Sequence, residues 1–96
     1  MSYKLLFLPS ALKEWKKLGS TIQEQFKKKL SERISNPIVP GDRLTGQKNY
    51  YKIKLRSSGY RLVYEVEKKT VTIYVIGVGK RDKSLIYKKA LKRGRE

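Results

Sequence analysis

The sequence contains no cysteine and no histidine among its 96 residues. Without cysteine there is no disulfide framework, thiol nucleophile or thiolate metal site. Without histidine the usual general acid and base is missing, and so is the commonest metal ligand. We therefore expect neither a metal site nor another cofactor. Any catalysis has to use lysine, arginine, tyrosine or carboxylate side chains.

Long apolar stretches are missing as well. No run approaches the ~18 apolar residues that a membrane-spanning helix needs. The apolar stretch at residues 5–8 is too short for a secretory signal. We expect a cytoplasmic protein, and its length fits one small domain over residues 1–96.

Acidic side chains are scarce, with 8 Asp and Glu against 24 Lys and Arg, which gives a formal net charge of +16. Such a charge repels itself and destabilises a compact state. The excess therefore indicates a polyanionic partner, either nucleic acid or an anionic membrane surface. Residues 1–48 hold 10 basic and 4 acidic side chains, and residues 49–96 hold 14 and 4. The second half is the better candidate for the surface that faces the anion.

Hydrophobic periodicity predicts an α+β fold in the order β-α-α-β-β-β-α, with a small sheet packed on a helical hairpin. We expect Ser10 to cap the first helix and Gly19 to end it in a left-handed conformation. Ser20 and Gln23 have the spacing of a capping box for the second helix. The predicted strands are residues 3–8, 50–55, 60–66 and 71–78, and the predicted helices are 11–18, 21–35 and 84–92.

The register of the hairpin at residues 50–66 follows from its apolar faces. A one-residue slip would turn the core side chains toward solvent. The pairing that avoids this places Ile53 opposite Leu62, with a four-residue turn between the strands. It also places Lys54 opposite Arg61, so two like charges face each other across the sheet, an arrangement that is normally destabilising.

A basic sheet face results from this register, because Lys52, Lys54, Arg56 and Arg61 then share one side. A solvated charged surface is the ordinary meaning of such a cluster, but no acidic residue on this face offsets the four charges. Near it, Lys80 and Arg81 follow the strand predicted at residues 71–78. Gly77 and Gly79 at the end of that strand allow a close approach of another chain or a ligand. Tyr87 lies six residues beyond Arg81, and its ring could stack on an unpaired base.

A second basic surface is predicted on the two N-terminal helices, away from their buried stripes. Its role would be phosphate contact without base specificity, and simple solubility is the alternative. Its residues are Lys13, Lys16, Lys17, Lys27, Lys28, Lys29 and Arg33.

These residues allow RNA cleavage by attack of a 2′-hydroxyl. Lysine is a poor base at its ordinary pKa of ~10.4, but neighbouring positive charges lower that pKa, and Lys54 has such neighbours. Arginine binds a phosphorane-like transition state with forked donors. Because such a site would cleave free RNA only weakly, much of the rate would come from orienting the substrate. A large partner that holds the RNA would provide this orientation.

The chain resembles the RelE family of bacterial toxins from Leu12 almost to its end. The segments that carry the resemblance are ALKEWKKL (residues 11–18), YKIKLR (51–56), GYRLVY (59–64) and VGKR (78–81), together with Tyr87. The resemblance implies a microbial-ribonuclease-like RelE/ParE fold. It also implies a metal-independent endoribonuclease that cuts mRNA in the ribosomal A site and halts translation, leaving a 2′,3′-cyclic phosphate and a 5′-hydroxyl.

The resemblance further implies catalytic roles for five residues. Lys52 and Lys54 would stabilise charge or take part in proton transfer. Arg61 would hold the scissile phosphate, and Arg81 would stabilise or protonate the leaving group. Tyr87 would stack on a codon base. Arg56 and Lys80 would contribute RNA or ribosome contacts beside them.

The partners implied are the ribosome with its 16S and 23S rRNA, mRNA, and an acidic RelB-type antitoxin, with no membrane partner. The toxin would reach operator DNA only through the antitoxin complex. The antitoxin would displace or block the C-terminal helix, in which Ile86, Ala90 and Leu91 are the expected contacts. A non-catalytic protein on the same scaffold, either a ParE-like gyrase inhibitor or an RNA-binding module, is the alternative.

Overall fold

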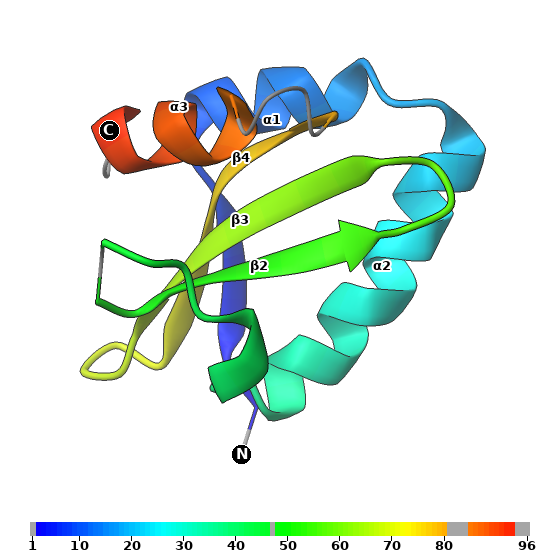
Figure 1. Ribbon diagram of the computed structural model, residues 1–96. Helices are drawn as coiled ribbons and strands as arrows, with labels where there is room; N and C mark the ends of the chain where they lie inside the picture. Colours follow the sequence, from blue (N-terminus) through cyan, green and yellow to red (C-terminus); the bar gives the residue numbers. More distant parts are fainter. Residues whose placement is uncertain (1, 47, 81–84, 94–96) are drawn as a thin grey trace.

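The fold has the predicted order β-α-α-β-β-β-α, with one additional 3₁₀ turn (Figure 1). The computed structural model describes residues 2–46, 48–80 and 85–93. Its elements are β1 (Lys4–Phe7), α1 (Pro9–Lys16), α2 (Ser20–Ser35), the 3₁₀ turn η1 (Pro40–Asp42), β2 (Tyr50–Leu55), β3 (Tyr60–Glu67), β4 (Thr72–Lys80) and α3 (Leu85–Arg93).

The four strands of the described chain form one mixed sheet in the order β1-β4-β3-β2. The β1 strand runs parallel to β4, while β2–β3 and β3–β4 are antiparallel. The interior position of β4 explains its nearly continuous apolar sequence, because a strand covered on both faces has no solvated side. The prediction of a small, mostly antiparallel sheet is confirmed.

The predicted hairpin register is also confirmed. Ile53 pairs with Leu62 and Lys54 pairs with Arg61. The connecting turn covers residues 56–59, and Gly59 has a φ of 78°, a left-handed conformation that glycine adopts without strain. The alternation of apolar side chains therefore carried enough information to place the basic residues of this hairpin.

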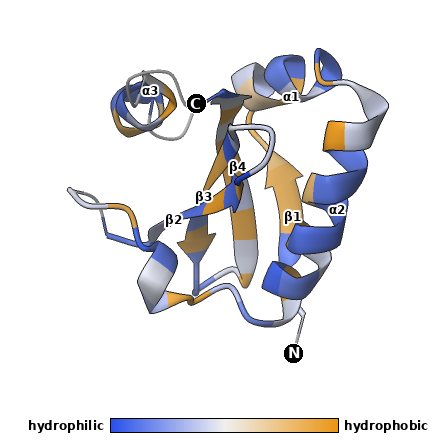
Figure 2. Cartoon of the chain, turned by 45° about the vertical axis from the view of Figure 1, so that its right-hand side comes forward, coloured by the Kyte–Doolittle hydropathy of each residue, from blue (hydrophilic) through white to orange (hydrophobic). Residues whose placement is uncertain are grey.

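The helices lie on both faces of the sheet (Figure 2). Helices α1 and α2 cover one face, where Phe26 and Leu30 are fully buried against the sheet. Helix α3 packs against β3 and β4 from the other face, through the buried Ile86 and Ala90. Both faces of β3 are therefore buried, which places part of the predicted basic face under α3.

The ends of the first two helices differ from the prediction. Helix α1 begins at Pro9, and Leu8 instead of Ser10 occupies its N-cap position, because proline is favoured in the first helical turn. Gly19 is not left-handed; it is extended (φ −67°, ψ 157°) and forms the N-cap of α2. No capping box forms. The side-chain amide of Gln23 instead donates to the Trp15 carbonyl at 2.9 Å, which links α2 to the end of α1.

Within the described ranges, no helix has the length and apolar character that crossing a membrane requires.

Candidate active site

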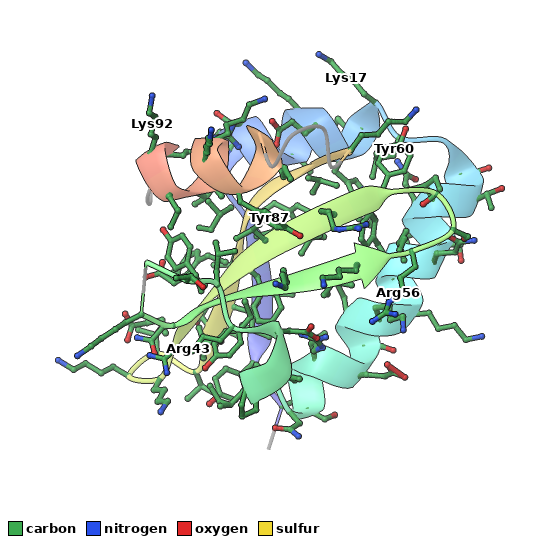
Figure 3. The ribbon with its side chains drawn as sticks, in the orientation of Figure 1. Lys17, Arg43, Arg56, Tyr60, Tyr87 and Lys92 are labelled. Atoms are coloured by element: carbon green, nitrogen blue, oxygen red, sulfur yellow. The ribbon has the colours of Figure 1, made fainter. Side chains whose placement is uncertain are left out.

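The candidate active site lies on the sheet face that α3 covers, at the β2–β3 hairpin. Lys52 and Lys54 come from β2, and Arg61 is the cross-strand partner of Lys54. Tyr87 projects from α3 toward the sheet (Figure 3). The Nζ atom of Lys52 lies 5.7 Å from the centroid of the Tyr87 ring, a cation–π distance. The structure thus brings four of the five predicted catalytic residues to one face.

Arg61 is more buried than a solvated basic face would allow, with 8% of the residue exposed. Its Nη1 donates to the Tyr60 carbonyl at 2.9 Å and to the Leu55 carbonyl at 3.5 Å. Its Nε is buried and has no hydrogen-bond partner in the part of the chain that the structure describes. A buried donor without an acceptor lowers the stability of the fold.

Lys54 has a pKa below its ordinary value of 10.5. Repulsion from Lys52 is the largest cause, followed by desolvation and by repulsion from Arg56 and Arg61. Asp42 of η1 opposes the shift through its negative charge. The predicted effect of crowded positive charge on this lysine is therefore present in the structure, although the side chain remains open to solvent.

Two glycines of β4 allow α3 to pack closely. They lie opposite Val63 and Arg61 on β3, on the face that α3 covers. A Cβ atom on Gly77 would lie 3.3 Å from Cδ1 of Ile86, and one on Gly79 would lie 3.7 Å from the same atom. The close approach that the sequence predicted here is made by the chain's own helix, which carries Tyr87 to the site.

The hydroxyl group of Tyr87 is buried, and it too has no hydrogen-bond partner among residues 2–46, 48–80 and 85–93. Arg61 Nε on β3 and Tyr87 Oη on α3 are therefore two buried polar atoms without a described partner, on the same side of the sheet. The fifth predicted catalytic residue, Arg81, lies outside the described residues.

The remaining predicted RNA contacts fall into two groups. Arg56 and Lys80 are exposed near the hairpin end of the site, and Nζ of Lys80 lies 5.7 Å from the centroid of the Tyr60 ring. Six helical lysines are exposed, as expected for a phosphate-binding surface. They are Lys13 and Lys16 of α1, Lys17 at its C-cap, and Lys27, Lys28 and Lys29 of α2.

Arg33 does not belong to this exposed surface, so its predicted position is wrong. Its side chain is 13% exposed and forms an ion pair with Asp42. It also donates to the Tyr64 hydroxyl at 2.7 Å and to the Lys52 carbonyl at 3.4 Å. Burial lowers the pKa of Arg33, but the interactions with Tyr64 and Asp42 raise it by more, so the net pKa lies above its ordinary value.

Sequence reasoning missed Asp42, which faces the basic cluster from η1. A signal was available, because Asp42 is the only carboxylate in the loop at residues 36–49. Arg33 follows Phe26 and Leu30 at helical spacings of seven and three residues, which places it toward the buried side of α2. Together the two residues join α2, η1 and β2 behind the site.

The three residues expected to contact an antitoxin differ in accessibility. Ile86 and Ala90 are buried against the sheet, whereas Leu91 is 36% exposed. A partner could reach the first two only if α3 moved. Within the described residues, no group of three or more Asp, Glu, His or Cys side chains is arranged to hold a metal ion.

Comparison with known proteins identifies the family of the chain and relates its fold to solved structures. The family described as ParE toxin of type II toxin–antitoxin system, parDE, matches residues 5–85. The mRNA interferase toxin RelE of Escherichia coli K12 is 55% identical over 93 residues, which cover 97% of this chain and 98% of the relative. A solved structure of a substituted E. coli RelE in the free state has a TM-score of 0.89 at 54% identity, covering 97% of this chain and 98% of that one.

A second solved structure, the intact E. coli RelBE toxin–antitoxin complex, contains a chain with a TM-score of 0.82 at 54% identity, covering 84% of this chain and 99% of that one. The α+β fold matches those of the solved RelE toxins, which places this chain among the small toxin domains. The chain belongs to the RelE/ParE family of type II toxins.

Proposed function

We propose that this chain is an endoribonuclease toxin that cleaves mRNA in the ribosomal A site and thereby inhibits translation. The relative named mRNA interferase toxin RelE matches it over nearly the full length of both chains. The observation that carries the proposal is the basic face, where Lys54 pairs with Arg61 and Lys52 lies beside Tyr87. A protein that only bound RNA would not need this like-charged pair, in which Arg61 is buried and Lys54 is open to solvent.

Arg61 is suited to hold the scissile phosphate. Its Nη1 is engaged with two backbone carbonyls, which orients the guanidinium on the basic face. A guanidinium that is oriented in advance binds a phosphate with little reorganisation at the moment of reaction. Lys52 adds positive charge beside it, and Tyr87 offers a ring on which a codon base can stack.

In the proposed reaction Lys54, or a group acting with it, removes the proton of the 2′-hydroxyl. The 2′-oxygen attacks phosphorus, the bond from phosphorus to the 5′-oxygen breaks, and the leaving oxygen takes up a proton. The products are a 2′,3′-cyclic phosphate and a 5′-hydroxyl. Lys52 and Arg61 stabilise the added negative charge, and we assign the leaving group to Arg81.

The site suits a reaction in which the ribosome orients the RNA. The lowered pKa of Lys54 increases the fraction of this side chain that can accept a proton. Accurate placement of the 2′-oxygen can supply ~7–11 kcal/mol of the barrier. We expect the exposed lysines of α1 and α2 to contact the RNA of the programmed ribosome, which includes 16S and 23S rRNA and the mRNA, and we place the action of the toxin in the bacterial cytoplasm.

We further propose a RelB-type antitoxin as the inhibitor, by analogy with the RelBE complex. An acidic antitoxin matches the net charge of +16. Because Ile86 and Ala90 are buried in the free chain, such a partner would either displace α3 or cover it from the side of Leu91. Displacement would also remove Tyr87 from Lys52. Contact with operator DNA would occur through the antitoxin.

The test is primer extension on mRNA bound to programmed ribosomes, with purified protein and with the A site either vacant or filled by tRNA. We expect cuts within the A-site codon only when that site is vacant. Ribosomes that remain intact with unbroken mRNA would support the alternative, a non-catalytic ParE-like or RNA-binding protein. Equal cutting of free RNA would show a nuclease that does not depend on the ribosome.

A further inference from the structure

Two of the three consecutive lysines on α2 face β2. Residues 25, 28, 29 and 32 follow the spacing of one helical stripe, and they line a surface concavity of about 410 Å³ together with Lys54 and Ser57. Lys27 points elsewhere, and its Nζ pairs with Glu24 at 3.3 Å. The concavity therefore belongs to Lys28 and Lys29, and the proposed catalytic lysine forms part of its wall.

The concavity wraps around an edge of the sheet. The β2 strand is the last strand in the order β1-β4-β3-β2. Lys54 extends from this edge strand, so it belongs both to the face that carries Arg61 and to the groove beside α2. Arg56 lies at the same end of β2, next to α2 (Figure 3). A polymer that reacts at Lys54 can continue into the groove without crossing the core.

The groove is cationic and open to further ligands. Three lysines line it against one carboxylate, Glu32. Over residues 2–46, 48–80 and 85–93, the ammonium groups of Lys28, Lys29 and Lys54 form no ion pair, although Glu32 lies in the same stripe. Gln25 and Ser57 add neutral hydrogen-bonding groups. Positive charges along a groove, with a few neutral donors, are the features that hold the backbone of a single strand.

We propose that this groove binds the phosphates of the substrate mRNA next to the scissile bond, with Lys28 and Lys29 as the contacts. The inference rests on the proposed function, and it separates these two lysines from the others on the helical surface. Ribosomal RNA has the same phosphate chemistry. The substrate strand is favoured because Lys54 connects the groove directly to the reacting phosphate, whereas α1 has no such connection.

The test compares affinity for two kinds of ribosome, one with mRNA truncated after the P-site codon and one with mRNA that extends through the A site. The A-site codon carries 2′-deoxynucleotides so that binding is measured without cleavage. The variant is Lys28→Gln/Lys29→Gln. The control is Lys68→Gln/Lys69→Gln, an adjacent exposed pair in the β3–β4 turn that removes the same charge.

We expect the Lys28→Gln/Lys29→Gln variant to lose roughly tenfold more affinity than the control on ribosomes with the extended mRNA, and to match the control on those with truncated mRNA. With the extended mRNA, the slope of log affinity against log salt concentration should become shallower by about 0.7 per lost contact. Equal losses on both ribosomes would assign the lysines to rRNA and overturn the inference. The inference would also be overturned if the Lys28→Gln/Lys29→Gln variant had the same affinity as the control on both kinds of ribosome. Because no cutting is needed, these outcomes are independent of the cleavage test above.

Discussion

Glu14 of α1 and Arg93 of α3 form a two-point ion pair at the free edge of β4. The two terminal nitrogens of the Arg93 guanidinium, Nη1 and Nη2, each donate to the Glu14 carboxylate at 3.2 Å. The pair also replaces a neighbouring strand, because Glu14 accepts from the Val78 N–H at 3.1 Å and Arg93 donates to the Ile76 carbonyl at 2.7 Å. The β1 strand pairs with β4 only as far as Val75. These side chains therefore supply hydrogen-bond partners to the β4 backbone groups that β1 does not reach. They also hold α3, the helix that carries Tyr87, against the sheet.

Replacing Glu14 should destabilise the fold. In Glu14→Gln the guanidinium of Arg93, which is largely buried, loses its charged partner. Hydrogen bonds to charged groups contribute ~1.5–3 kcal/mol, so we expect the free energy of unfolding to fall by about 2 kcal/mol in urea titrations. Glu24→Gln is the matched control, since its partner Lys27 is exposed and surface pairs contribute little. Equal effects of the two substitutions would contradict a role for Glu14 in holding α3.

The same carboxylate should make stability depend on pH. Burial raises the pKa of Glu14, but hydrogen bonds from Arg93, the Val78 N–H and Lys89 lower it by more, and the net pKa lies below the ordinary 4.5. A carboxylate with a lowered folded-state pKa stabilises the fold above its unfolded pKa, and this stabilisation is lost as the pH falls through the folded-state value. We expect unfolding free energies measured from pH 6 downward to drop below pH ~4.5. The drop should be smaller in Glu14→Gln, and identical curves would show that Glu14 is not responsible.

Arg33 should act on stability and not on RNA binding. Arg33→Gln leaves the Asp42 carboxylate and the Tyr64 hydroxyl without their guanidinium partner. We expect a loss of about 2–3 kcal/mol in the free energy of unfolding, with an unchanged salt slope of ribosome binding for the molecules that remain folded. Lys29→Gln should behave in the opposite way, because its side chain is exposed. If Arg33→Gln reduced the salt slope as Lys29→Gln does, the sequence-based interpretation of Arg33 as an RNA contact would be restored.

The pH profile of cleavage should report on Lys54. If Lys54 acts as the base, the single-turnover rate rises with pH up to its pKa, which lies below 10.5 chiefly because of Lys52. Lys52→Gln removes the largest cause of that shift, so the rising limb should move to higher pH in addition to any loss in rate. Arg56, Arg61 and Asp42 remain as the other charges that act on Lys54. If the rate of Lys52→Gln rises over the same pH range as that of the unchanged protein, another group accepts the proton.

Local patterns predicted the sheet but not the contacts between distant elements. The alternation in β2 and β3 is contained in each strand, so the pairing of Lys54 with Arg61 follows from the amino-acid sequence alone. Glu14 and Arg93 are 79 residues apart, and nothing in their neighbourhoods indicates that they meet at the edge of β4. Gly19 shows a related limit, since glycine suits either end of a helix and only the short connection from Lys17 to Ser20 decides which.

The most direct measurement replaces one 2′-hydroxyl in the A-site codon with hydrogen, at the nucleotide on the 5′ side of the cut. Attack by that hydroxyl is the central step of the proposed mechanism, in which Lys54 removes its proton and Lys52 and Arg61 stabilise the added negative charge. We expect cleavage at that bond to disappear in primer extension while the protein still binds the programmed ribosome. Cleavage that persists at the deoxy position would mean that another nucleophile attacks the phosphate, and the proposed mechanism would be wrong.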